Sequence, residues 1–212
     1  MDPTIIQFPP STALRSRIIK TASGLIFARG YSEVTMDEIA WDLGISKKTL
    51  YLHFPSKQSL ATEVIDAVAG QVRASAEAIL DQTDLTFPEK LSRLLAGITE
   101  RLSQVTAPVL RDLQRHAPEV YERIEAVRGR AIPFIFSRIL EEGRQAGAIR
   151  SDVNFSLAIE YHLRAVQGLI NPESLAKLAM TPAEAAEQAL RIFFHGMLLD
   201  PPGRTHEKRV SR

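Results

Sequence analysis

The fold of this chain is decided in its first third, where residues 35–54 read TMDEIAWDLGISKKTLYLHF. Thr35 and Glu38 form a capping box, the Thr-x-x-Glu pattern that begins a helix. Gly44 ends this helix after about two turns, because glycine adopts the positive φ of a sharp turn without steric cost. Ser46 then caps a second short helix over residues 47–53. Two short helices joined by a tight turn predict a helix-turn-helix.

The charges of this segment suit DNA. From Gly44 to Lys57 the sequence has three basic residues, Lys47, Lys48 and Lys57, and no acidic residue. Lysines, hydroxyl groups and helix N-termini are the groups that contact phosphates. The second helix of a helix-turn-helix enters the major groove, so we expect residues 47–53 to be a recognition helix.

The rest of the chain also reads as helices. Helical spacing of apolar residues continues to about residue 199, and no stretch alternates apolar and polar residues as a half-buried strand does. The sequence therefore predicts an all-α fold of nine or ten helices, with an N-terminal three-helix helix-turn-helix domain followed by a helical bundle.

Composition excludes several classes of protein. With 212 residues, 45% of them hydrophobic, and a net charge of +1, the chain is neither disordered throughout nor polybasic. It has no cysteine, which excludes disulfides, thiolate nucleophiles and cysteine-ligated zinc. No histidine pair has metal-ligand spacing, and no phosphate-binding loop, nucleophile elbow or dinucleotide fingerprint occurs. We expect no metal, no cofactor and no enzymatic activity.

The sequence also predicts where the protein acts. The first ten residues carry no basic region and are interrupted by prolines, unlike a signal peptide. No run approaches the roughly 20 apolar residues of a membrane span. We expect a cytoplasmic protein that does not contact a membrane.

A longer pattern surrounds the helix-turn-helix segment. Its spaced positions are Arg17, Gly24, Phe27, Gly30, Tyr31, Thr35, Ile39, Ala40, Gly44, Ile45, Ser46, Thr49, Leu50, Tyr51, His53, Phe54, Ser56, Lys57 and Leu60. This pattern resembles the TetR family of bacterial transcriptional regulators over about residues 15–64, and the remainder resembles it in architecture alone. The prolines at the start and the polar residues at the end predict a flexible arm (1–10) and a flexible tail (201–212). Between them, the resemblance implies a DNA-binding domain (11–60) and a ligand-binding and dimerisation domain (61–200).

The motif and the resemblance together indicate which residues contact DNA. Phosphate contacts are expected from Thr35, Tyr51 and Lys57, and a base edge or a phosphate from Thr49. The full predicted set is Thr35, Lys47, Lys48, Thr49, Tyr51, His53 and Lys57. Two alternatives stay open: Thr35 acts only as a helix cap, and Tyr51 packs against the first helix.

A ligand pocket is expected in the C-terminal body, because helical bundles form such sites between their helices. The candidate lining residues mix apolar and polar side chains: Leu94, Ile98, Leu102, Arg111, Gln114, Tyr121, Phe134, Tyr161, His162 and Gln167, with Phe136 and Arg164 beside them. The alternative is that the aromatic residues pack the core and the polar ones lie on the surface. The mixture predicts an apolar ligand held by a few polar groups.

Two C-terminal helices, residues 155–169 and 181–199, are apolar on two faces. A helix of this kind must bury both faces, one against its own chain and the other against a partner. We predict a four-helix interface with two-fold symmetry. The predicted interface residues are Leu157, Tyr161, Ala165, Gly168, Ala186, Leu190, Phe193 and Met197.

These features predict a ligand-responsive transcriptional regulator. The protein is expected to be a repressor that binds a palindromic DNA operator as a homodimer and is released by a small-molecule effector in its C-terminal domain. Two alternatives stay open, a helical-fold enzyme and a DNA-binding protein without a small-molecule switch.

Overall fold

The computed structural model describes residues 12–198 and contains ten α-helices, with no strand in this part of the chain. They are α1 (Thr12–Arg29), α2 (Met36–Leu43), α3 (Lys47–His53), α4 (Lys57–Leu80), α5 (Phe87–Ser103), α6 (Ala107–His116), α7 (Pro118–Gln145), α8 (Phe155–Leu169), α9 (Pro172–Leu178) and α10 (Pro182–His195). The predicted all-α fold is confirmed. The predicted arm (1–10) and tail (201–212) lie outside the described residues.

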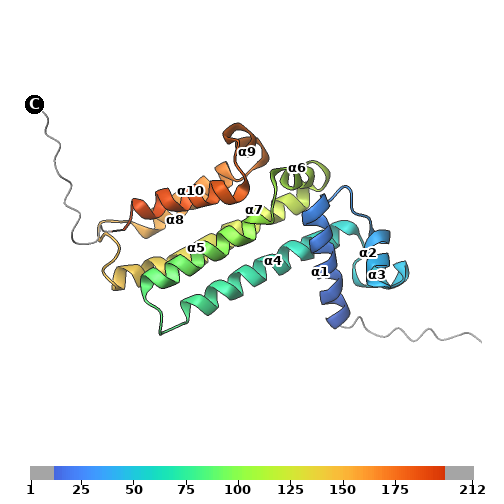
Figure 1. The fold of residues 1–212 in the computed structure, drawn as a ribbon, viewed down its shortest axis with the longest axis horizontal. Helices are drawn as coiled ribbons and strands as arrows, with labels where there is room; N and C mark the ends of the chain where they lie inside the picture. Colours follow the sequence, from blue (N-terminus) through green and yellow to red (C-terminus); the bar gives the residue numbers. More distant parts are fainter. Residues whose placement is uncertain (1–11, 199–212) are drawn as a thin grey trace, which may run out of the picture.

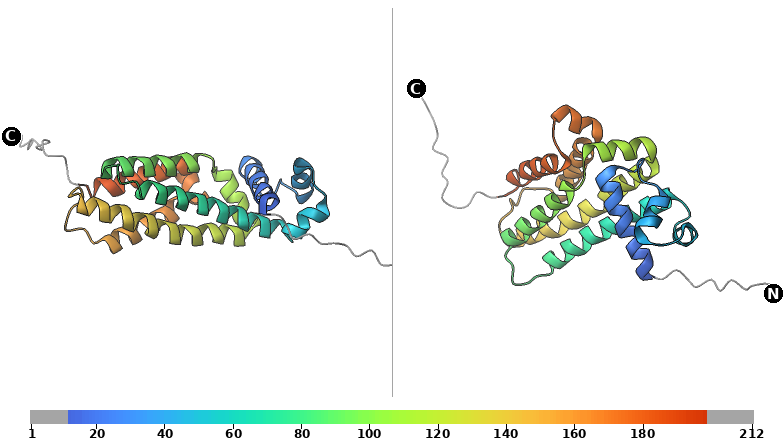
Figure 2. Two further views of the ribbon diagram at one scale, coloured as in Figure 1. Left: turned by 90° about the horizontal axis from the view of Figure 1, so that it is seen from below. Right: turned by 45° about the vertical axis from the view of Figure 1, so that its right-hand side comes forward.

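The helices form a long body with a small unit at one end. Helices α4, α5, α7, α8 and α10 run side by side along the molecule, and α1, α2 and α3 gather beyond one end of the body (Figure 1). The views in Figure 2 show the same division from two other directions. None of the described helices is both long enough and apolar enough to cross a membrane.

The hydrophobic core of the small unit continues into the body. Ile18 of α1, Ile39 of α2 and Leu50 of α3 are fully buried together. Leu60 and Val64, from the first turns of α4, complete the same cluster. Val109 of α6 and Val120 of α7 also belong to it. The small unit is therefore attached to the body by continuous packing and not by a loose linker.

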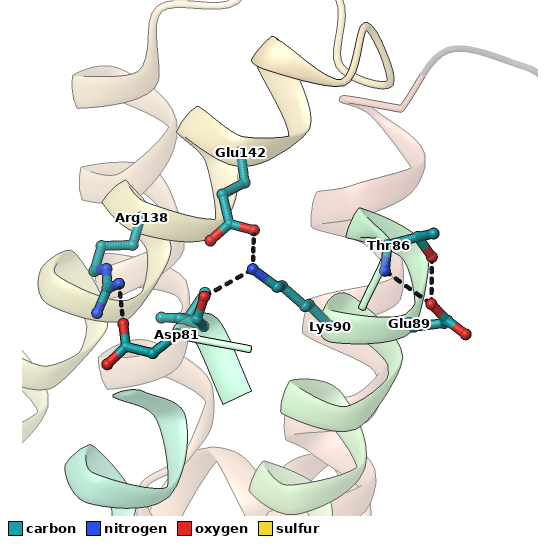
Figure 3. A network of polar contacts seen from close by, with 7 residues as sticks. Asp81, Thr86, Glu89, Lys90, Arg138 and Glu142 are labelled. Atoms are coloured by element: carbon teal, nitrogen blue, oxygen red, sulfur yellow. Dashed lines mark hydrogen bonds and ion pairs between the residues drawn. The ribbon is translucent and has the colours of Figure 1, made fainter. Parts of the chain in front are cut away.

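At the far end of the body, a buried lysine fixes the corner between α4 and α5 (Figure 3). The Lys90 ammonium donates to the carbonyl oxygen of Leu80 (2.7 Å) and to Glu142 Oε2 (2.8 Å) on α7. A cation is favourable at this position because the C-terminus of a helix carries partial negative charge. A second pair, Arg138 with Asp81 at 2.7 Å, joins the same corner to α7 from a more exposed position.

Candidate nucleic-acid interface and ligand cavity

Helices α2 and α3 have the geometry of a helix-turn-helix. Thr35 Oγ1 accepts the backbone N–H of Glu38 (3.2 Å), and Ser46 Oγ accepts that of Thr49 (3.0 Å), so both predicted caps are present. Gly44 ends α2 with a φ of 65°, in the left-handed region. Leu50 is fully buried against α1 and α2, and this contact fixes which face of α3 points away from the core.

The outward face of α3 carries most of the predicted DNA contacts. Lys47 and Lys48 are exposed, and Tyr51 is 47% exposed, so part of the Tyr51 side chain is available for a contact with DNA. Thr49 and His53 are half-buried at the edges of this face. The Thr49 hydroxyl shares a 2.8 Å hydrogen bond with Ser46 Oγ.

The two flanking helix starts carry the remaining predicted contacts. Thr35 is exposed and caps α2 by accepting the backbone N–H of Glu38. The hydroxyl can still donate its proton to a phosphate. Lys57 begins α4, with its ammonium 4.3 Å above the ring of Tyr31 and 3.4 Å from the Ser32 carbonyl oxygen. Burial lowers the pKa of Lys57 below its ordinary value, although Asp112 and Glu33 oppose this effect.

Lys47 has a neighbour that the sequence analysis did not anticipate. Its ammonium is ion-paired with Asp37 of α2. The segment 44–57 has no acidic residue, but the fold brings one to it from the preceding helix. Lys48 has no ion-pair partner among the described residues. In the DNA-free protein, Lys48 is therefore the more available of the two cations.

His53 lies at the end of α3 with one ring nitrogen buried. Its Nδ1 is sealed from solvent and has no hydrogen-bond partner among the described residues. A buried N–H without an acceptor is among the rarest states in proteins, whereas a bare acceptor nitrogen is better tolerated. We therefore assign the proton of the neutral ring to Nε2. In this tautomer, His53 offers DNA a hydrogen-bond donor.

The turn between α1 and α2 is held from the body by α6. The backbone N–H of Ser32 donates to Asp112 Oδ2 (2.8 Å), and Asp112 Oδ1 lies 2.8 Å from His116 Nδ1. Burial alone would raise the pKa of Asp112, but the hydrogen bonds with Ser32 and His116 lower it below its ordinary value. Gly30 makes this approach possible, since its φ is 98° and an added Cβ would lie 3.0 Å from the Asp112 carboxylate.

A cavity of about 240 Å³ lies inside the body, next to this turn. Its walls come from α4, α5, α6, α7, α8 and α10, and Phe27 adds a wall from α1. Apart from Arg101, Arg128 and His162, every lining residue is apolar. The cavity is thus an apolar chamber that reaches the first helix of the helix-turn-helix unit.

Three of the predicted pocket residues, Ile98, Leu102 and His162, line this cavity, as does Phe136. Leu94 is buried in the core next to the chamber, and Tyr121 packs half-buried beside it. Neither these two nor the other five predicted residues line the cavity. Arg111, Gln114 and Tyr161 are exposed, Phe134 holds the Arg73 guanidinium over its ring, and Gln167 is half-buried and accepts from Arg164.

Residues of α1 and α4 also line the cavity, and none of them was among the predicted pocket residues. Val68 and Val72 of α4 line the cavity, and so does Phe27 of α1. Apolar spacing within α4 does not tell which helices pack against it. Arg111, Gln114, Phe134, Tyr161 and Gln167 were misplaced because aromatic or polar character does not reveal which side of a helix faces inward.

The predicted interface residues divide by helix. On α8, Leu157 and Tyr161 are 69% and 63% exposed, Gly168 is exposed and Ala165 half-buried, so this face is open to a partner. On α10, the predicted residues Ala186, Leu190, Phe193 and Met197 are all buried in the chain's own core, which corrects the prediction for this helix. Its exposed apolar residue is Ile192, at 68%.

The α10 residues face inward because of the aromatic cluster below them. Phe193 lies 5.4 Å from Phe136 and 4.7 Å from His162 between ring centroids. Ala186 and Leu190 form part of the cavity wall. The face of α10 with Ala186, Leu190 and Phe193 therefore meets the body, and the partner-facing surface is left to α8 and the Ile192 side of α10.

Comparisons with known proteins agree with this architecture. Residues 18–64 match the family described as "Bacterial regulatory proteins, tetR family". The chain is 24% identical over 184 residues to YvaF, an HTH-type transcriptional regulator of Bacillus subtilis, with 87% of this chain and 95% of that protein covered. It is 20% identical over 193 residues to the HTH-type transcriptional repressor DhaR of Mycobacterium sp. strain GP1, with 88% and 93% covered.

The fold is also found among solved structures. The SmeT–triclosan complex superimposes with a TM-score of 0.63 at 18% identity, with 89% of this chain and 93% of that chain covered. The relatives named above are transcriptional regulators and not enzymes. Residues 18–64 therefore match the DNA-binding domain of the TetR family of bacterial regulatory proteins, and over most of its length the chain resembles helix-turn-helix transcriptional regulators.

Proposed function

We propose that this protein is a transcriptional repressor that binds a palindromic operator as a homodimer and is released by a small molecule in its cavity. One observation carries the proposal: the cavity wall includes Phe27 of α1 as well as helices of the body. An occupant therefore touches the DNA-binding unit directly. The proposed functional division is residues 11–60 for DNA and 61–200 for ligand and dimerisation.

The continuity of α4 supports the same coupling. Leu60 is buried in the core of the helix-turn-helix unit, whereas Val68 and Val72 of the same helix line the cavity. A ligand that changes the position of α4 must therefore move both the cavity wall and the core of the helix-turn-helix unit. It can change operator affinity only as far as it binds the two conformations differently, and such coupling is typically about 1–3 kcal/mol.

The exposed apolar residues of α8 and α10 support the homodimer. Leu157, Tyr161 and Ile192 are large apolar side chains exposed in the single chain. A two-fold interface over them would bury the patch and hold two recognition helices about 34–36 Å apart, one turn of DNA. A regulator of this kind acts where the chromosome is, which makes the cytoplasm its proposed location.

The relatives support two finer parts of the proposal. DhaR is named a repressor, and SmeT was solved with triclosan, a small molecule. Of the two alternatives, an enzyme has no support from the regulators that this chain resembles. The cavity argues against a DNA-binding protein without a switch.

The experiment that tests the proposal begins with the DNA. Sequences selected from a random pool by the full chain should share an inverted repeat, and sedimentation of the complex should show a protein dimer on each site. A selected site without two-fold symmetry contradicts the homodimer. Reporter transcription that falls when the site is removed contradicts repression.

A second arm tests release. A compound that lowers operator affinity must bind the operator-bound protein more weakly, by the same factor, because coupling between two sites is reciprocal. Its affinity is measured by calorimetry with and without saturating operator. Equal affinities for the two forms contradict release from the cavity.

A further inference from the structure

His162 is the one uncharged polar side chain in the cavity wall. It is 3% exposed, and its ring lies 4.6 Å from that of Phe136 and 4.7 Å from that of Phe193. Neither ring nitrogen makes a hydrogen bond with a described residue, and neither is sealed by protein atoms as His53 Nδ1 is. Both nitrogens therefore keep some accessible surface, and the open space that His162 is known to line is the cavity.

The ring is uncharged at neutral pH. Burial lowers the pKa of His162 from 6.5 to about 4. A neutral imidazole has one N–H donor and one acceptor nitrogen. A buried polar group without a partner costs free energy, which a ligand recovers when it supplies the missing hydrogen bond.

The two arginines of the wall are already engaged. Arg128 donates to Glu125 Oε1 (2.6 Å) and to the carbonyl oxygen of Ile170 (3.1 Å). Arg101 donates to the Gly97 carbonyl oxygen (3.1 Å) and to Ser75 Oγ (2.7 Å). No carboxylate lines the cavity. A cationic ligand would meet Arg101, which has no carboxylate partner among the described residues, and would find no carboxylate of its own. An anionic ligand would lose its hydration on entering an otherwise apolar wall.

The volume limits the size of the ligand. A cavity of about 150 Å³ holds benzene, which has six non-hydrogen atoms. By proportion, the 240 Å³ of this cavity suits a molecule of about ten non-hydrogen atoms.

We propose that the cavity binds a neutral, compact, mostly apolar molecule of about ten non-hydrogen atoms whose single hydroxyl or carbonyl group hydrogen-bonds to His162. This inference rests on the proposed function, since it names the chemical class of the effector. His162 supplies the polar recognition, and the apolar wall supplies the shape.

Four probes of one shape test the class by calorimetry on the full chain without DNA: 2-naphthol, naphthalene, 2-naphthoate and 2-naphthylmethylammonium. We expect 2-naphthol to bind about threefold to tenfold more tightly than naphthalene, the range of one hydrogen bond. The two charged probes should bind at least a hundredfold more weakly than 2-naphthol. Tighter binding of 2-naphthoate, or no binding of 2-naphthol at its solubility limit, overturns the proposal.

Three variants test the role of His162. In His162→Phe, the preference for 2-naphthol over naphthalene should vanish while naphthalene binds as before. His162→Gln, which keeps a donor and an acceptor, should retain part of the preference. His195→Phe, the same substitution at an exposed site on α10, should leave all four affinities unchanged. An equal loss of both neutral probes in His162→Phe would show that the residue only packs.

A failure of the proposed ligand class can be distinguished from a failure of the proposed regulatory function. Binding of 2-naphthol through His162 with no change in operator affinity would leave the ligand class standing and contradict release. Selection of no operator at all would contradict the regulatory proposal and leave the calorimetric result unaffected. Circular dichroism melts of the three variants establish that each is folded at the temperature of the titrations.

Discussion

At the scale of the residue, Lys57 and Thr49 are expected to make different kinds of DNA contact. The Lys57 ammonium is held beside Tyr31 and the Ser32 carbonyl, at the start of a helix that follows α3. A lysine is a flexible point charge that suits phosphate and carries no base information. Lys57→Ala should therefore weaken operator and random DNA alike.

Salt titration measures this effect. Loss of one phosphate contact in each subunit should flatten the slope of log K against log salt by about 1.8 per dimer, at about 0.9 per contact. Lys177→Ala, which removes an exposed lysine from α9, is the matched control and should leave the slope unchanged. An unaltered slope in Lys57→Ala would exclude Lys57 from the phosphate contacts.

Thr49 is expected to read sequence. Its methyl and hydroxyl groups suit a thymine methyl or a base edge in the major groove. Thr49→Ala should lower operator affinity by about 1 kcal/mol per half-site and leave the affinity for random DNA and the salt slope nearly unchanged. Competition with scrambled DNA measures this. An equal loss of affinity for operator and scrambled DNA would make Thr49 a backbone contact. The Ser46→Ala variant removes the hydrogen bond between the Ser46 and Thr49 hydroxyls but keeps Thr49, so it separates the effect of that bond from the effect of a base contact.

The residues that the sequence predicted best are those with local partners. The caps at Thr35 and Ser46 depend on backbone groups three residues away, so their pattern is complete in the sequence. Asp37 beside Lys47 and Asp112 beside Ser32 were not predicted, because a turn or a separate helix brings them together.

At the scale of the element, the Lys90 corner is the clearest case of stability hidden from sequence. Lys90 is buried and bonded to the carbonyl oxygen of Leu80 and to Glu142, which lies 52 residues along the chain. Lys90→Met keeps the packing but leaves a carbonyl and a partly exposed carboxylate without their donor. We expect a loss of about 1–3 kcal/mol in the free energy of unfolding, measured by urea denaturation.

The neighbouring Arg138 provides the matched control. Its pair with Asp81 is more exposed, and exposed ion pairs contribute about 0–1 kcal/mol. Arg138→Met should therefore cost less than Lys90→Met. Equal losses would mean that the burial of Lys90 contributes nothing beyond an ordinary surface pair.

Helix α10 shows why periodicity predicted the helix but not its orientation. Its apolar residues cover two adjacent faces, and either could have met the body. The aromatic cluster of Phe136, His162 and Phe193 decides between them, and it joins three helices that are distant in sequence. Spacing within one helix contains no information about that cluster.

At the scale of the whole molecule, the homodimer should depend on α8. Tyr161→Glu places a charge in the exposed apolar patch with Leu157 and Ile192, and a dimer buried over it would have to desolvate that charge. Sedimentation velocity at micromolar concentration should show a folded monomer. Phe193→Glu should instead unfold the chain, because Phe193 is buried in its own core. A dimeric Tyr161→Glu protein would place the interface elsewhere.

Coupling between the cavity and DNA should depend on Phe27. This side chain lines the cavity from the last turn of α1, three residues before Gly30 and the turn that Asp112 holds through Ser32. A ligand that presses on Phe27 acts on the helix-turn-helix unit without an intermediary. In Phe27→Ala, ligand and operator should each still bind, but the ligand's effect on operator affinity should fall at least threefold from its wild-type value, within a usual range of about 5–150-fold.

Val166→Ala is the control for this last experiment, since Val166 lines the same cavity from α8 and belongs to the core of the body. It should weaken ligand binding and leave the coupling factor unchanged, because no contact with α1 is removed. Phe27→Leu, which keeps an apolar side chain against the shared core, guards against simple loss of folding. If Phe27→Ala retained the wild-type coupling factor, the signal would have to travel through α4, α6 or α7, since Phe27 is the sole cavity residue that α1 contributes.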